Sequence, residues 1–152
     1  MPKIDIAAAP ERGGSGYPAP FDAPCAQRMR RQLGDAAGLS DFGVNLLHLR
    51  PGVWSSQRHW HDREDEFVYV VSGEVVLVTD AGATVLKAGD CAGFPKGKAD
   101  GHHLINRSAP EAVVLEVGTR STDDTTVYSD IDMKYDPAKG YGRKDGTPYP
   151  RR

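Results

Sequence analysis

Residues 59–73 read HWHDREDEFVYVVSG, and this stretch decides how the rest of the chain is interpreted. On a β-strand, side chains two positions apart point to the same face, so His59 and His61 can approach one small ion. Glu66 opens the next run, residues 67–71, whose β-branched and aromatic side chains indicate a buried strand. Two imidazoles and one carboxylate suit a divalent metal such as Zn, Fe, Ni or Mn.

A third imidazole lies downstream, at His102 or His103, in another segment punctuated by glycine and proline. A single histidine is usually a surface or core residue with no ligand role, and a His-x-His pair alone is weak support for a metal site. Three imidazoles together with a carboxylate are a much more specific set. The sequence therefore predicts a site for one divalent metal ion.

Short strands separated by turn signals fill the middle of the chain. Arg50-Pro51-Gly52 is a typical turn, because proline presets φ and glycine supplies a positive φ. No convincing amphipathic helix competes in this region. Strands repeated at roughly 8–12-residue intervals are typical of a sandwich or barrel, so the predicted fold is all-β. The eight predicted strands are residues 44–49, 54–61, 66–71, 75–79, 83–86, 91–94, 102–106 and 112–118.

Length and composition restrict the class of protein. The 152 residues suffice for one domain, and a net charge of -2 gives no footprint for nucleic acid or a membrane surface. No run approaches the roughly 18 apolar residues of a membrane span. We expect a cytoplasmic location, because the N-terminus lacks a signal-peptide pattern. The two cysteines do not make a disulfide framework.

The two ends differ from the middle of the chain. Residues 1–43 are expected to form an extended, proline-rich arm with an edge strand at Lys3–Ala7. Cys25–Leu33 is a helix or a strand, and its arginines are expected to form a solvated face. Residues 119–152 are expected to be an extension that packs on the body through Tyr128, Met133, Tyr135, Tyr141 and Tyr149. An arm beside an open sheet edge favours strand exchange, so we expect a homodimer.

The order of these residues resembles the two motifs of the cupin superfamily. The first motif is matched by Gly52, six residues, His59-x-His61, four residues, Glu66, six residues and Gly73. The second is matched by Gly89, five residues, Pro95-x-Gly97, four residues, His102, three residues and Asn106. One extra residue before the histidine pair and two before His102 depart from the family pattern, in positions where loops tolerate insertions. The resemblance covers residues 44–118.

The resemblance implies a cupin-type double-stranded β-helix, or jelly-roll, barrel with one divalent metal ion per subunit. It assigns His59, His61, Glu66 and His102 as ligands, while His103 alternates to the opposite face. Small cupins are commonly dimers. Four protein ligands leave coordination positions open for water or substrate.

Because alternate side chains of a strand share a face, strand parity predicts which residues line the pocket. Gln57 shares a face with His59 and, like Phe94, is a predicted substrate-binding residue, within an interior expected to be mostly apolar. We expect a metal-dependent cupin enzyme, an oxidoreductase or lyase, acting on a small organic substrate. Dioxygenase, decarboxylase or lyase, and isomerase chemistry all remain open. Sugar-phosphate isomerases are less favoured, because no pocket arginine or lysine is evident. The alternative is a non-enzymatic cupin that binds or senses a small ligand.

Overall fold

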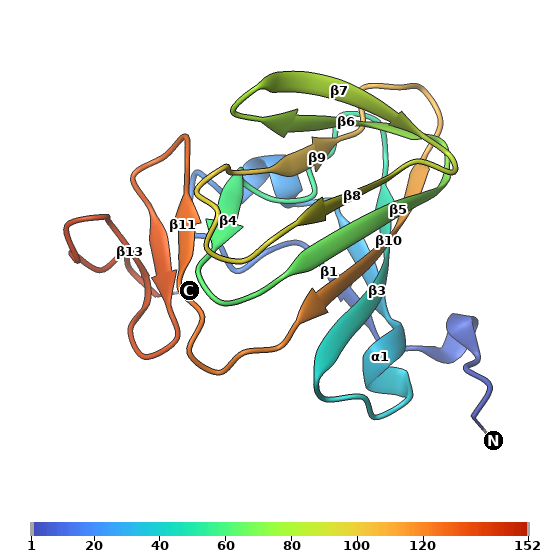
Figure 1. The fold of residues 1–152 in the computed structure, drawn as a ribbon, viewed down its shortest axis with the longest axis horizontal. Coiled ribbons are helices and arrows are strands. Elements are labelled where there is room, and N and C mark those ends of the chain that lie inside the picture. The colour runs from blue at the N-terminus through green and yellow to red at the C-terminus, as the bar shows by residue number, and fades with distance from the viewer. Residues whose placement is uncertain (1, 152) are drawn as a thin grey trace.

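The computed structural model describes residues 2–151, which form mainly antiparallel strands with a few helical turns (Figure 1). The helical segments are η1 (Ile6–Ala8), η2 (Ala23–Cys25) and α1 (Leu33–Ala36), and none is long and apolar enough to cross a membrane. The strands are β1 (Glu11–Gly13), β2 (Met29–Gln32), β3 (Phe42–Leu49), β4 (His59–His61), β5 (Glu66–Ser72), β6 (Glu74–Thr79), β7 (Gly82–Lys87), β8 (Cys91–Phe94), β9 (His103–Ile105), β10 (Ala112–Thr119), β11 (Thr126–Tyr128), β12 (Lys134–Asp136) and β13 (Gly140–Gly142).

The strands form three sheets. The largest has the order β1-β2-β3-β10-β5-β8, a second has the order β13-β12-β11-β4, and the third has the order β7-β6-β9. All of the pairings are antiparallel, and many neighbours in a sheet are far apart in sequence, as in β3-β10-β5. This is the jelly-roll arrangement, and it confirms the predicted fold class.

The main core lies between the largest sheet and the three-stranded sheet. Alternate residues of β5, such as Val68 and Val70, point inward, while Phe67 and Tyr69 are exposed on the outer face. This period of two is expected for a strand with one buried face. The buried cluster consists of Leu47, Leu49, Val53, Val68, Val70, Val75, Leu86, Leu104, Ala112 and Val114.

A second core joins the two ends of the chain beside β4. Its buried members are Tyr17 and Cys25 from the N-terminal arm and Tyr128 and Met133 from the tail. In Figure 1, the tail strands β11 and β13, in orange and red, lie on the same side of the molecule as β4. The tail is therefore part of the structure around β4, because β11 pairs directly with that strand.

The eight strands predicted between residues 44 and 118 correspond to β3 through β10. Two local predictions were wrong. The edge strand expected at Lys3–Ala7 is replaced by η1, because the Asp5 carboxylate accepts the N–H of Ala7 and starts a helical turn. The strand expected over Trp54–His61 is shortened to β4, because residues 55–58 form a series of bends.

Gly73 lies at the tight turn between β5 and β6, where a side chain has no room. Its φ is +75°, and a Cβ there would lie 2.8 Å from the carbonyl oxygen of Glu111. Gly52 has a similar φ of +83°, but a Cβ added there would meet no atom within 4 Å. We expect Gly52→Ala to cost about 1–2 kcal/mol of unfolding free energy from backbone strain. Gly73→Ala should cost about 1–3 kcal/mol more, from the added steric clash.

Urea denaturation of the two variants measures the difference. Equal losses of stability would show that the close approach of Glu111 does not restrict residue 73.

Candidate metal centre

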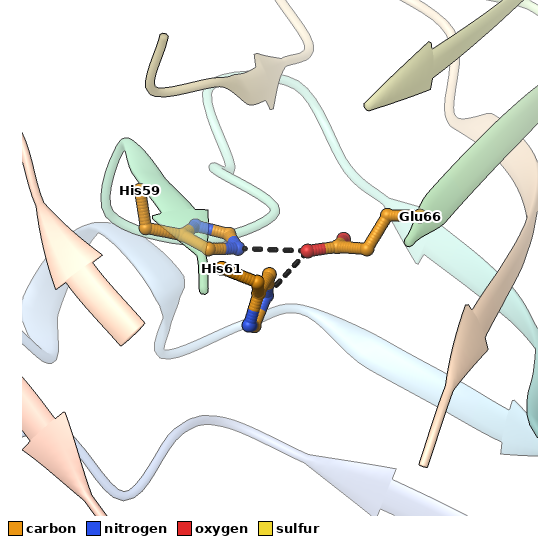
Figure 2. Close-up of side chains that lie close together, drawn as sticks. All are labelled: His59, His61 and Glu66. Atoms are coloured by element: carbon orange, nitrogen blue, oxygen red, sulfur yellow. Dashed lines mark hydrogen bonds and ion pairs between the residues drawn. The ribbon is translucent and has the colours of Figure 1, made fainter. Parts of the chain in front are cut away.

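Two histidines of β4 approach the same carboxylate oxygen of Glu66, the first residue of β5. Figure 2 shows the His59 and His61 imidazoles directed at Glu66. The Nε2 atom of His59 lies 3.3 Å from Oε1 of Glu66, and Nε2 of His61 contacts the same oxygen. One donor atom from each of the three residues lies within 4.8 Å of the other two. The spacing predicted from strand parity therefore places both imidazoles on one side of β4.

His102 approaches the same carboxylate from the segment just before β9. Its backbone N–H donates to the carbonyl of His59, and the His59 N–H donates to the carbonyl of His102, so the two residues face each other in an isolated bridge. Nε2 of His102 lies 3.5 Å from Oε2 of Glu66. The structure thus brings His59, His61, Glu66 and His102 together, while His103 turns to a different partner, with Nδ1 2.8 Å from the carbonyl oxygen of Ser56.

Contacts behind the imidazoles fix the direction of their Nε2 atoms. Nδ1 of His59 lies 2.8 Å from the carbonyl oxygen of Gln57, which can only accept, so this nitrogen carries the proton. Nδ1 of His61 lies 2.6 Å from Oδ2 of Asp124. The Phe94 ring stacks on the His102 ring with a centroid distance of 3.6 Å and an interplanar angle of 3°. The contacts at Nδ1 therefore hold the His59 and His61 rings from the side opposite Glu66, and the Phe94 ring holds His102 along its face.

Asp124 is a positioning residue that strand parity and motif spacing do not reveal. It is buried, and its second oxygen accepts the backbone N–H of Arg63 at 2.7 Å. A carboxylate that orients a ligand histidine is a common partner of metal sites, because it fixes the tautomer and increases the basicity of the ring. Asp124 lies in the tail, and it reaches His61 because β11 pairs with β4.

The local electrostatics follow from one carboxylate among several imidazoles. Burial opposes ionisation of Glu66, but the neighbouring imidazoles of His102, His59 and His61 outweigh it and hold the pKa of Glu66 well below the usual value. Burial also opposes protonation of His61, yet Glu66 and Asp124 raise its pKa to about 9. For His102, burial dominates and lowers the pKa. The Glu66 carboxylate and the His102 imidazole are thus favoured in the form that binds metals, whereas His61 must lose a proton to bind one.

The donor set fits a divalent metal ion. Both ring nitrogens of His102 are buried, and neither has a hydrogen-bond partner among residues 2–151. A buried polar atom without a partner is unfavourable, and the 3.5 Å separation from Glu66 is too long for a good hydrogen bond. A cation held between the His102, His59 and His61 nitrogens and the Glu66 carboxylate would satisfy these atoms. Three imidazoles and one carboxylate suit Zn, Fe, Ni or Mn.

The four residues open into a cavity of about 610 Å³. Phe94 lines this cavity next to His102, as does Val68 of β5. Gln57 does not reach it: its amide donates to the carbonyl of Phe21 at 2.8 Å and thereby secures the N-terminal arm. Parity misplaced Gln57 because residues 55–58 are bends and do not continue the β4 strand.

The cavity wall is far more polar than the sequence suggested. The expectation that the pocket lacks arginine was wrong, because Arg12, Arg28, Arg30 and Arg120 all line the cavity. The expectation of a solvated arginine face at Cys25–Leu33 was also wrong for Arg28 and Arg30. Alternation along β2 turns Arg30 toward the cavity, and only Arg31 points outward to Glu11. Tyr17, Tyr128, Tyr135 and Tyr141 complete this part of the wall.

Comparisons with known proteins agree with this architecture. The family model described as a cupin domain matches residues 45–118. The crystal structure described as a sugar phosphate isomerase from a cupin superfamily, from Silicibacter pomeroyi, is 47% identical, with a TM-score of 0.91 over 98% of this chain and 97% of that chain. Among curated proteins, none matches this chain.

More distant structures share less. A protein from Acidithiobacillus ferrooxidans, whose description also refers to a sugar phosphate isomerase, is 29% identical, with a TM-score of 0.74 over 84% of this chain and 83% of that chain. The polyketide cyclase RemF from Streptomyces resistomycificus is 17% identical, with a TM-score of 0.63 over 91% of each chain. At that identity, RemF shows the fold alone.

Replacing Asp124 tests its effect on the neighbouring ligand. Asp124→Asn should weaken metal binding by about 10–100-fold, because the amide no longer holds the Nδ1 proton of His61 with a full negative charge. Asp123→Asn is the matched control, since Asp123 is exposed and contacts Arg63 and Ser121. Competition with a chromophoric chelator measures both affinities. Equal affinities for the two variants would mean that Asp124 does not support the ligand.

Proposed function

This chain belongs to the cupin superfamily, and from that premise we propose that it is a metal-dependent isomerase of a small phosphorylated sugar. The observation that carries the proposal is one cavity that contains both the histidine–carboxylate site and a wall of arginine and tyrosine side chains. The relative at 47% identity, described as a sugar phosphate isomerase, supports the same substrate class.

Aldose–ketose isomerisation suits this site because it needs no external oxidant or reductant. One hydrogen moves from C2 to C1 and one proton moves from the C2 hydroxyl to the C1 oxygen, so the atoms of substrate and product balance. A divalent metal bound by His59, His61, Glu66 and His102 would supply Lewis-acid polarisation of the carbonyl and hydroxyl oxygens. The protein's contribution is to hold these oxygens beside each other and to limit the access of water.

The chain provides space for such a substrate beside Glu66. In the register of the largest sheet, Gly118 of β10 lies directly opposite Glu66, and Gly43 of β3 lies opposite Gly118. Neither glycine fills the cavity with a side chain, and both line it. A volume of about 610 Å³ is within the usual range for small-molecule sites. Phe94, Val68 and Leu104 line the cavity with apolar surface.

The alternative function is a cupin that binds a small ligand without turning it over. The same cavity and the same metal ligands would serve it equally well. The two functions differ in one measurable property, which is the conversion of the substrate to its isomer during incubation with the metal-loaded protein.

We expect the metal-loaded protein to interconvert phosphorylated aldoses and ketoses within a panel of three- to seven-carbon sugar phosphates. Proton NMR follows the loss of the substrate and the appearance of its isomer. A chelator should abolish turnover, and return of the metal should restore it. Stoichiometric metal binding with no turnover of any panel member would overturn the isomerase and leave the binding protein.

Substitution of a ligand links the activity to this site. Glu66→Ala should lose bound metal and lower turnover at least about 100-fold, because Glu66 is the carboxylate shared by all three imidazoles. His48→Ala is the control, since His48 lies on β3 next to Glu111 and does not line the cavity. Elemental analysis and the NMR assay are applied to both variants. Full metal occupancy in Glu66→Ala would exclude Glu66 as a ligand.

A further inference from the structure

Three arginines meet where the N-terminal arm closes the cavity. Arg12 of β1 is paired directly with Arg30 of β2, and Arg28 precedes Arg30 by two residues. All three side chains line the same cavity as the metal ligands. Directly opposed like charges destabilise an antiparallel strand pair unless anions compensate for them. Glu116 compensates for Arg30, with 2.6 Å between Nε and Oε1.

The outer face of the same two strands shows the opposite pattern. There Arg31 pairs with Glu11, with 2.6 Å between guanidinium and carboxylate. Arg31 thus has an acidic partner directly across the strand pair, whereas Arg30 faces Arg12 and takes its acidic partner, Glu116, from β10. Such a contrast between the two faces of the β1–β2 pair indicates that the inward arginines serve a ligand.

Hydrogen bonds hold the guanidinium groups of Arg28 and Arg30 in position. Arg28 donates through Nε to the carbonyl of Gly14 at 2.7 Å and through Nη1 to the carbonyl of Ser55, and neither bond neutralises its charge. Arg30 is paired with Glu116, with Nε 2.6 Å from Oε1. Arg12, Arg28 and Arg30 together with Glu116 leave an excess of two positive charges among these four side chains. A phosphate monoester carries a charge of about −1.5 to −2 at neutral pH, which matches this excess.

A continuous row of rings connects the arginines to the metal ligands. The guanidinium carbon of Arg28 lies 5.8 Å from the Tyr17 ring centre. The rings of Tyr17 and Tyr128 are 5.4 Å apart between centroids, and those of Tyr128 and His59 are 5.8 Å apart. These contacts place guanidinium, phenol and imidazole groups in succession along one wall, so a ligand on this wall lies between the arginines and the histidines.

We propose that Arg12, Arg28 and Arg30 form a subsite that binds the phosphate monoester of the substrate while its carbonyl end faces the histidine–carboxylate centre. The subsite deepens the isomerase function proposed above and rests on it for the identity of the rest of the substrate. Guanidinium groups suit this role, because their N–H donors can bind phosphate oxygens in pairs.

Titration calorimetry with inorganic phosphate tests the subsite without any assay of turnover. The metal-loaded protein and the same protein in EDTA should both bind phosphate, because the subsite does not use the metal. Arg12→Gln and Arg28→Gln should each weaken binding about tenfold or more, since each removes a charged donor. Arg31→Gln is the matched control from the outer face of β2 and should bind phosphate like the original chain.

Thermal denaturation of each variant shows whether its fold is intact. Arg12 is exposed, so Arg12→Gln keeps the test valid if Arg28→Gln does not fold. Unchanged phosphate affinity in Arg12→Gln, or binding that disappears in EDTA, would overturn the subsite. Malonate binding more tightly than phosphate with the same arginine dependence would also overturn it in favour of a carboxylate site.

The outcome separates the subsite from the isomerase. Arginine-dependent phosphate binding without turnover of any sugar phosphate supports the subsite and contradicts the isomerase. Turnover of a sugar phosphate with a KM that neither Arg12→Gln nor Arg28→Gln changes supports the isomerase and contradicts the subsite.

Discussion

One carboxylate shared by three imidazoles governs the arrangement of this molecule. Glu66 is largely enclosed, and its charge is stabilised by His59, His61 and His102, which come from β4 and from the segment before β9. The fold must therefore bring the ends of three separate segments to one point. It does so through the β5–β8 pairing, which places Phe94 opposite Glu66, and through the bridge between His59 and His102. Moving any of these segments would leave a buried charge or a buried imidazole without a partner, which is costly.

The terminal segments, which look like appendages in the sequence, complete the cavity. Residues of the tail supply Asp124 behind His61 and Tyr128 beside His59. Residues of the N-terminal arm supply Tyr17, Arg12, Arg28 and Arg30 to the same cavity. The second core, with Cys25 and Met133 fully buried, joins arm to tail and keeps both walls in place. A centre formed by the middle of the chain is thus given its polar surroundings by the two ends.

Local pattern was sufficient to predict the middle of the fold and the approach of His59 and His61 to Glu66, and the cupin motif spacing selected His102 over His103. The period of two in a strand places His59 with His61, and turn residues delimit the eight strands from β3 to β10. Long-range pairing decides the rest. Asp124 reaches His61 only because β11 adds to β4, and the inward direction of Arg30 depends on the register of β2 against β3. No local signal fixes such a register, so sequence pattern offered no reason to place arginine in the cavity. The opposite error occurred at Gln57, which was predicted to line the pocket. That prediction extended the side-chain alternation of β4 into residues 55–58, where the chain bends.

The most direct measurement is a crystal structure of the metal-loaded protein with anomalous diffraction collected at the absorption edge of the bound metal. We predict one ion per chain, bound by Nε2 of His59, His61 and His102 and by the carboxylate of Glu66 at about 2.0–2.3 Å. At least one coordination position should face the cavity. An ion held elsewhere in the chain, with these four side chains keeping their present contacts, would contradict the metal centre described above.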